Sequence, residues 1–554
     1  MKTAAPLAGA GRLAGAAALI AVLTVASRLA GFGRTAVFLW VMGDRNDLGD
    51  LYLLANTVPN VVFEIVAGGA LASLVVPLLA GAVAAGDREA VSATTGALLS
   101  WTLALLVPLA AAVALLAGPI MSLIAHDPTA AQLAAGSRML RIFAPQLPLY
   151  GVGIVLTGVL QAHRRFAWPV IAPLLSSVTV IGVYLTFAAV DGLRVDLARV
   201  SLAGQFILAG GTTLGVVVLT LSLLIPLRRL GLRPRPGFAF TGEARSLIGR
   251  LAGAGAATVV GQQVALVLLL NQADGGPAGS VIVFNFAQTV YLLPWAVLAV
   301  PLAVAAYPAL AAAHATGDRD GYRATLAPTV RGVLLLSCLG AAALVATAGP
   351  VAAFLPGVTD PDPVAAGIAG FAPGLLGYGL FAVLSRALYA RADTRVAGAA
   401  TAAGWLVVPV AAVPLAAAFP VADRVLAVTL ANSLGMLVLG ALLLAVVARR
   451  AGRPALAGLS RTGLVGVLAG AVAAAVGMAV SAGLAGVWPG TPTRAGTLVQ
   501  GMLSGVAVAA VFVAVAYPLD PHDVRPLVAG VRTRVRRLAG RGRPDPAVTR
   551  AERR

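Results

Sequence analysis

The stretch from Thr24 to Pro77 carries ionisable side chains inside two apolar segments, where charge is costly. Arg28 and Arg34 lie in the first segment and Glu64 lies in the second. At about 1.5 Å of rise per residue, Arg28 and Glu64 each lie roughly 20 Å from the outer end of their helix. Both are therefore expected near the middle of a membrane. Two interpretations stay open: a charged cavity that receives an anionic substrate, or an Arg28–Glu64 pair that only fixes helix packing.

The elements that must hold these charges are membrane-spanning helices. Of the 554 residues, 59% are hydrophobic and 11% are charged, and the mean hydropathy is +0.92. Apolar runs long enough to cross a bilayer recur throughout the chain. They predict an all-α polytopic membrane protein of about fourteen spans, at 13–41, 51–82, 91–117, 135–161, 169–190, 200–226, 246–271, 279–312, 325–352, 364–389, 396–419, 425–448, 462–487 and 496–517.

The charge of the loops predicts the orientation of these spans. With the N-terminus inside, the inner segments hold 29 of the 40 lysine and arginine residues and the outer loops hold only five. Basic residues concentrate on the cytoplasmic side of membrane proteins. Both termini are therefore predicted to be cytoplasmic, in a multi-pass protein of the bacterial cytoplasmic membrane.

The sequence also repeats itself. Pro77 is followed after eight residues by Gly-Asp-Arg at 86–88, and Pro308 is followed after eight residues by Gly-Asp-Arg at 317–319, an offset of 231. A weaker echo links 160–162 with 388–390, at an offset of 228. These matches predict two six-helix lobes in a parallel pseudo-twofold repeat, at 1–226 and 246–448. A cytoplasmic linker at 227–245, two added spans at 449–517 and a basic cytoplasmic tail at 518–554 complete the predicted division.

Several kinds of chemistry are not supported by the residues present. Lys2 is the only lysine, so a P-loop cannot be formed, and Cys338 is the only cysteine, so an internal disulfide cannot be formed. The four histidines are scattered without ligand spacing. We therefore expect no enzyme activity, no catalytic residue, no cofactor, no metal site and no nucleic-acid partner.

Four further arginines lie within predicted spans. Arg138 and Arg141 are in the outer turns of the fourth span, where they could line an outer gate or extend to the membrane surface. Arg331 and Arg386 lie within about two or three turns of the inner face. We expect these two side chains to extend to the inner membrane surface.

Two groups of basic residues lie on the predicted cytoplasmic side. Arg164 and Arg165 follow His163 at an inner turn, where they could contact a phosphate or simply anchor the turn. The arginine-rich tail is expected to attract anionic lipid of the inner leaflet.

At this point the motifs resemble those of the MurJ/MviN family of lipid II flippases. The residues that carry the resemblance are Ser27-Arg28-Leu29-x-Gly31-x-x-Arg34, Asp50, Pro59-Asn60, Gly69 and Pro77, then Gln161-x-x-Arg164-Arg165-Phe166-x-x-Pro169-x-x-Ala172-Pro173, Leu293-Pro294, Pro308 and Ala390-Arg391-x-Asp393-Thr394-Arg395. The resemblance covers essentially the whole chain. The scarcity of lysine is consistent with an actinobacterial member.

The resemblance implies a flippase of the multidrug/oligosaccharidyl-lipid/polysaccharide exporter superfamily. Its lobes would enclose a cationic cavity and move undecaprenyl-pyrophosphate-linked peptidoglycan precursor from the inner to the outer leaflet by alternating access. The implied substrate-binding residues are Arg28, Arg34, Asp50, Glu64 and Gln288. Proteins of cell-wall synthesis or division are possible partners.

The chain departs from the family pattern at several charged positions. Phe63 and Gly68 stand where the family commonly has Arg and Glu, and Gln288, Thr289 and Leu292 stand where it commonly has Asp, Arg and Glu. Two alternatives therefore stay open beside the flippase. One is an exporter of another polyprenyl-linked glycan or of a drug, and for a cationic drug Glu64 would be the key residue. The other is a non-transporting paralogue that scaffolds the cell-wall machinery.

Overall fold

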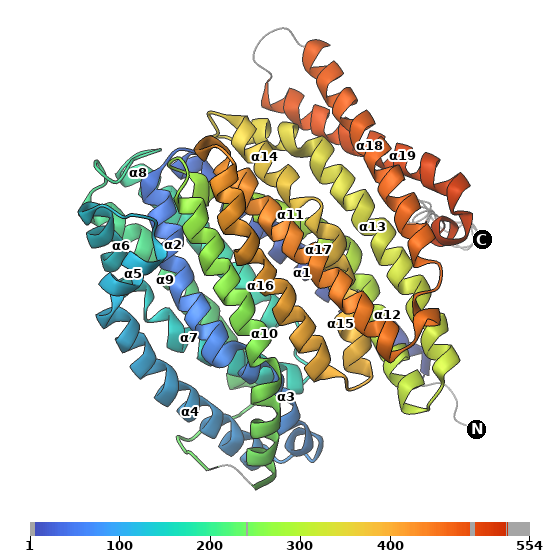
Figure 1. Ribbon diagram of the computed structural model, residues 1–554. Coiled ribbons are helices and arrows are strands. Elements are labelled where there is room, and N and C mark those ends of the chain that lie inside the picture. Colours follow the sequence, from blue (N-terminus) through green and yellow to red (C-terminus); the bar gives the residue numbers. More distant parts are fainter. Residues whose placement is uncertain (1–5, 240–241, 488–492, 528, 530–554) are drawn as a thin grey trace, which may run out of the picture. The chain divides into compact units, whose positions relative to one another are not determined.

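The computed structural model describes residues 6–239, 242–487, 493–527 and 529, and the regular structure of these residues is entirely helical. Figure 1 shows the helices in chain order. Their bounds are α1 (Pro6–Met42), α2 (Asp47–Phe63), η1 (Glu64–Gly68), α3 (Gly69–Ala84), α4 (Arg88–Leu115), α5 (Ala117–Ile124), α6 (Ala130–Phe143), α7 (Gln146–Ala162), α8 (Trp168–Val190), α9 (Leu202–Arg229), α10 (Gly242–Asp274), α11 (Ser280–Pro294), η2 (Trp295–Ala299), α12 (Val300–Ala315), α13 (Arg319–Phe354), α14 (Pro361–Phe371), α15 (Gly374–Ala390), α16 (Thr394–Ala418), η3 (Val421–Asp423), α17 (Arg424–Arg450), η4 (Arg453–Leu456), α18 (Leu459–Val487) and α19 (Arg494–Leu519).

The predicted all-α membrane architecture is confirmed. Within the described residues, 11 helices are long and apolar enough to cross a membrane, or 12 if α14 and α15, which meet at a bend of 41°, form one span. The other two predicted spans, 51–82 and 246–271, lie on α2–η1–α3 and on α10 and include side chains outside the described part of the chain. The number fourteen therefore stays a prediction.

The chain forms two compact units. Unit 1 comprises Met1–Leu292, Val351–Gly374 and Thr394–Leu439, and unit 2 comprises Leu293–Pro350, Leu375–Asp393 and Gly440–Arg554. The predicted lobes, linker, added spans and tail follow the chain rather than these units, and they stay a prediction. Most of the basic tail, from residue 530 onward, lies outside the described residues.

The local structure repeats at the offset that the sequence indicates. Each copy contains a π-helical segment between two α-helices, η1 beginning at Glu64 and η2 beginning at Trp295, which are 231 residues apart (295 minus 64). π-Helical segments are rare and often occur at functional positions. Two such segments at equivalent positions support an ancestral duplication.

The helices α4 and α13, which are the second helix after η1 and after η2, begin in the same way. Asp87 caps α4 by accepting a hydrogen bond from the Ala90 N–H at 2.9 Å, and Asp318 accepts one from the Gly321 N–H at 2.8 Å, again 231 positions later. An aspartate at this position satisfies a backbone donor that the helix leaves unpaired. The turns after α7 and α15 also agree, because Arg164 and Ala392 both have positive φ, at 58° and 59°. The duplication is thus visible in capping and turn geometry.

Unit 1 has an apolar core at the ends of helices that the orientation prediction places near the cytoplasm. It is formed by buried side chains of α3, α4, α7, α8 and α9, together with Leu232 from the segment after α9. Val91 of α4 and Leu227 of α9 belong to this core and are almost fully buried. The region between these helix ends in the first repeat is therefore filled by apolar side chains.

Unit 2 contains α18 and α19, which pack against each other (Figure 1). Arg331 of α13 donates from Nε and Nη2 to the two carboxylate oxygens of Asp523 at 2.6 and 3.0 Å, and from Nη1 to the Ala457 carbonyl at 2.7 Å. The Arg331 and Asp523 side chains are only 12% and 8% exposed. Both partners lie in segments predicted to be cytoplasmic, so the expected direction of the Arg331 side chain stays a prediction, while its guanidinium is buried in an ion pair rather than exposed.

Candidate functional site

The two arginines of α1 are available to bind a ligand. Arg28 is exposed and Arg34 is half-buried, and among the described residues neither guanidinium forms an ion pair or a hydrogen bond. α1 runs unbroken from Pro6 to Met42, so both arginines project from a continuous helix. A guanidinium offers five donors in a fixed fork that matches carboxylate and phosphate groups. These arginines can therefore engage an anion without breaking contacts with described residues.

Glu64 is the first residue of the π-helical segment η1 and is exposed. Within the described part of the chain it forms no ion pair, with Arg28 or with any other residue. The predicted alternative of a packing pair between Arg28 and Glu64 is thus not formed. All three charges of the segment remain unneutralised by described side chains.

A network of tyrosine hydroxyls lies close to Arg34. The Tyr52 hydroxyl lies 2.6 Å from the Thr212 hydroxyl and 3.1 Å from the Tyr184 hydroxyl. The side chains of Tyr52, Tyr150 and Tyr184 all lie within electrostatic reach of the Arg34 guanidinium. Buried tyrosines normally require a hydrogen-bond partner, which makes them conspicuous inside apolar spans. All three tyrosines lie inside predicted spans, but charge alone does not single them out in the sequence.

A second group of polar side chains surrounds Tyr150. Its hydroxyl donates to Gln146 Oε1 at 2.9 Å, and Gln146 Nε2 donates to the Thr213 hydroxyl at 3.1 Å. Asn60, of the Pro-Asn motif in α2, donates from Nδ2 to the Asn56 carbonyl at 3.1 Å. Phe63 packs its ring against Tyr150 at 5.6 Å and is buried. The position where the family commonly has Arg is therefore filled by packing in this chain.

Asp50 lies among backbone donors at the beginning of α11. Its two carboxylate oxygens accept hydrogen bonds from the Gly279 N–H at 2.7 Å and the Ile282 N–H at 2.9 Å, and the residue is 5% exposed. Asp44 is similarly engaged, because it accepts from the backbone N–H groups of Thr359 and Asp360, each at 2.9 Å. Both carboxylates thus hold backbone segments together within unit 1.

The remaining candidate residues are distributed over unit 1. Gln288 is half-buried on α11 and has no hydrogen-bond partner among the described residues. Arg138 donates to Gln205 Oε1 at 2.9 Å, while Arg141 is exposed and makes only a long contact of 3.4 Å with the Ala114 carbonyl. Arg164 and Arg165 are exposed at the turn after α7. The roles of these residues in binding or gating stay predictions.

The comparisons with known proteins agree on one family. A family model described as "Lipid II flippase MurJ" matches residues 41–491. A lipid II flippase MurJ of Burkholderia cenocepacia is 28% identical over 382 residues, which cover 67% of this chain and 72% of the relative. A probable lipid II flippase MurJ of Haemophilus influenzae is 25% identical over 394 residues, covering 67% and 75%.

Solved structures show the same fold. A lipid II flippase MurJ in an inward closed conformation superposes with a TM-score of 0.68 at 17% identity, covering 90% of this chain and 99% of that chain. An inward-facing multidrug transporter of the MATE family follows with a TM-score of 0.63 at 14% identity, covering 78% and 98%. Because the family model matches most of its length, the chain belongs to the lipid II flippase MurJ family.

Proposed function

We propose that this membrane protein is a lipid II flippase that moves the undecaprenyl-pyrophosphate-linked peptidoglycan precursor from the inner to the outer leaflet of the bacterial cytoplasmic membrane. Transport would proceed by alternating access, with both termini in the cytoplasm. Family membership supports the substrate, and the curated relatives carry this activity in their names. The fold is shared with solved structures named as a lipid II flippase and as a MATE-family transporter.

One observation carries the assignment of residues. Arg28, Arg34 and Glu64 lie in a stretch predicted to cross the membrane, yet they have no ionic partner among the described residues. A charge in such a position is expensive unless something compensates it. A diphosphate that enters between the two arginines would provide that compensation through charge-assisted, bidentate hydrogen bonds.

The neutral polar groups beside Arg34 have a complementary role. The hydroxyls of Tyr52, Tyr150 and Tyr184 make their hydrogen bonds to other neutral groups and contribute only a polar surrounding within electrostatic reach of Arg34. Because they are uncharged, they do not compete with a diphosphate for the positive charge. Glu64 lowers the net charge of the site and so limits how tightly the anion is held, which favours release on the other side.

The experiment is rescue of a bacterium depleted of its own lipid II flippase. We expect the native chain to restore growth, and Arg28→Ala or Arg34→Ala to abolish it, with membrane levels compared by immunoblot. Arg28→Lys and Arg34→Lys keep the charge but lose the fork, and should rescue partly. Arg88→Ala, which changes an arginine at the start of α4, is the matched control and should rescue fully.

Glu64→Gln separates the flippase from an exporter of cationic compounds. In a flippase it should leave rescue largely intact, whereas a cationic substrate would make it the most damaging change of the set. Full rescue by both arginine-to-alanine variants would exclude the proposed diphosphate contact.

A further inference from the structure

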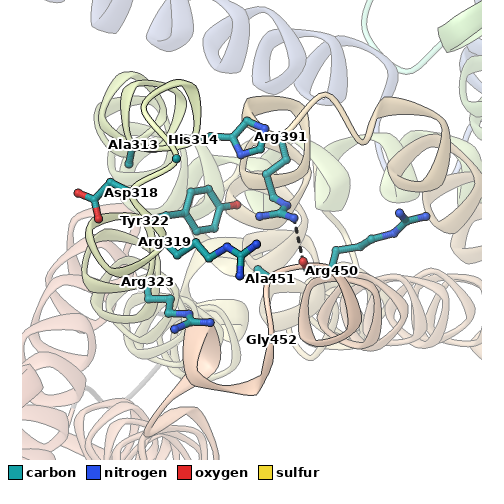
Figure 2. Close-up of a pocket in the computed structure, with 11 residues that line it drawn as sticks. Ala313, His314, Asp318, Arg319, Tyr322, Arg323, Arg391, Arg450, Ala451 and Gly452 are labelled. Atoms are coloured by element: carbon teal, nitrogen blue, oxygen red, sulfur yellow. Dashed lines mark hydrogen bonds between the residues drawn. The ribbon is translucent and has the colours of Figure 1, made fainter.

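Unit 2 contains a pocket that the transport site does not include. The cavity has a volume of about 440 Å³, which is within the range of small-molecule sites. It is lined by the end of α12, the first turns of α13, the turn after α15 and the end of α17. Figure 2 shows the side chains of Arg319, Tyr322 and Arg391 gathered in this pocket, with Arg323 nearby.

Positive charge dominates the lining of the pocket. Arg319, Arg323, Arg391 and Arg450 line it, and Asp318 is the one acidic residue among the described residues of the lining. The Asp318 carboxylate is already engaged, because it caps α13 through the Gly321 N–H. Arg323 pairs with Asp320, and Arg391 and Arg450 both pair with Asp393, so Arg319 is the lining arginine without an ionic partner among the described residues.

The arginines differ in how firmly they are held. Arg391 donates to the Arg450 carbonyl at 2.8 Å and to Asp393 at 3.3 Å, and its guanidinium lies 5.5 Å from the centre of the Tyr322 ring. These contacts fix its position before any ligand binds. Arg319 is exposed and has no hydrogen-bond or ionic partner among the described residues. One donor group is thus preorganised and another is free to close on a ligand.

The first repeat has a different lining at the positions equivalent to Tyr322 and Arg323. Val91 and Ser92 are the counterparts of Tyr322 and Arg323, each 231 positions earlier. Val91 belongs to the apolar core, and Ser92 accepts a hydrogen bond from the Arg233 N–H at 3.4 Å. The tendency of basic residues to gather on the cytoplasmic side explains Arg88 and Arg319 equally well. It does not explain why this corner of the second repeat is open and lined with additional arginines.

We propose that this pocket binds a phosphate group. Guanidinium groups bind phosphate through paired, charge-assisted hydrogen bonds, and the nearby N-terminus of α13 adds favourable partial charge. The lining residues directly flank predicted spans, which places them at the depth of lipid headgroups. Anionic lipid of a cytoplasmic leaflet attracts basic residues that lie near the membrane surface. The expected source of the phosphate is therefore an anionic phospholipid, and a soluble phosphate ester shares the same chemistry.

The test is native mass spectrometry of the full-length protein in detergent. Phosphatidylglycerol, phosphatidylcholine and soluble glycerol phosphate are added in parallel, and the bound fraction of each is titrated. Arg319→Gln with Arg323→Gln is the pocket variant. Among the described residues Arg319 has no hydrogen-bond or ionic partner, and the ion pair of Arg323 is with Asp320, which is 93% exposed. Arg88→Gln is the matched control from the equivalent position of the first repeat. Thermal unfolding without added ligand verifies that both variants remain folded.

We expect phosphatidylglycerol to bind the native chain and the control equally, and the pocket variant about tenfold or more weakly, because charge-assisted hydrogen bonds are lost. Binding of phosphatidylcholine should not distinguish the three proteins. Displacement of the lipid by glycerol phosphate, with the same loss in the pocket variant, would keep the phosphate site and assign its ligand to the soluble pool. Equal binding of phosphatidylglycerol by the native chain and the folded pocket variant would overturn the proposal. The measurement does not depend on transport.

Discussion

The helices α4 and α13 occupy equivalent positions in the two repeats, but different kinds of contact join them to other segments of the chain. Ser92 and Ser100 of α4 accept backbone N–H groups of Arg233 and Gly237, so the segment after α9 lies directly on the helix. The equivalent positions of α13, 231 residues later, are Arg323 and Arg331. Small side chains on α4 thus allow the backbone of the segment after α9 to lie against this helix. On α13 the equivalent positions carry long cationic side chains: Arg323 lines a pocket, and Arg331 forms an ion pair with Asp523 in the segment after α19.

In the π-helical segments the charged residue lies in the first repeat and its uncharged counterpart lies in the second. Glu64 in η1 is exposed and has no described partner. Trp295, its counterpart in η2, donates to the Tyr378 carbonyl at 3.1 Å and stacks on the Tyr378 ring at 4.7 Å. At this position the first repeat has a carboxylate without an ionic partner among the described residues, and the second has an indole whose N–H is hydrogen-bonded. The two copies of the duplicated framework therefore differ in charge and in contacts at equivalent positions.

The largest effect is expected at the anchor on α13. Asp523→Asn should lower the free energy of unfolding by about 3–5 kcal/mol, because it leaves Arg331 buried without its countercharge. Thermal unfolding of the purified protein in detergent would measure the loss. Asp320→Asn, which removes the exposed partner of Arg323, is the control and should cost less than about 1 kcal/mol. Equal effects of the two variants would show that the anchor is no stronger than a surface pair.

Acid should weaken the same anchor. Burial raises the pKa of Asp523, but the hydrogen bonds from Arg331, His522 and Thr462 together lower it by more. The net result is a pKa below the ordinary value of 3.8. A carboxylate whose pKa is depressed by folding stabilises the native state above the unfolded pKa, and this contribution is lost as the pH falls through the folded pKa. Thermal stability should therefore fall below about pH 4 in the native chain. The fall should be smaller in Asp523→Asn, and an identical acid profile would contradict the assigned cause.

A smaller loss of stability is expected where the segment after α9 lies against α4. A side chain added at Gly96 would meet the Arg235 carbonyl, which is backbone and cannot rotate away. Gly96→Ala should therefore destabilise unit 1 by about 1–3 kcal/mol, in the range of overpacked sites. Ala327→Gly at the equivalent position of α13 removes a buried methyl group and lowers helix propensity without adding a clash, and should cost about 1 kcal/mol or somewhat more. Unchanged stability of Gly96→Ala would show that the covering segment is not tightly seated.

The smallest effect is expected at Ser100. Ser100→Ala removes the acceptor of the Gly237 N–H and should cost about 1 kcal/mol, the net value of a neutral hydrogen bond. Thermal unfolding again provides the measurement. A cost similar to that of Asp523→Asn would remove the contrast between the two anchors.

The sequence allowed the helices to be predicted, but not the contacts between distant side chains. Each predicted span lies on one to three consecutive helical segments of the structure, because hydropathy is a local property of the chain. The offset of 231 residues found at Pro77 and Pro308 also relates the two π-helical segments. In contrast, the partner of Arg331 lies 192 residues away, at the end of an added span. No local pattern indicates such a pairing, and depth alone suggested an unpaired side chain.

The candidate site was only partly accessible for the same reason. Charge inside apolar segments identified Arg28, Arg34 and Glu64, whose roles in transport stay predictions. The hydroxyls around Arg34 come from α2, α7 and α8, and only the fold brings Tyr52, Tyr150 and Tyr184 together.

The binding of Asp50 to backbone N–H groups has a consequence for how the contact is inherited. Its partners at Gly279 and Ile282 contribute main-chain atoms, which every residue except proline supplies. Drift of the side chain at position 282 therefore leaves the bond intact, whereas change at position 50 removes it. Comparison of related sequences would show an invariant aspartate without a co-varying partner, and methods that infer contacts from correlated substitutions would overlook this link between the first and second halves of the chain.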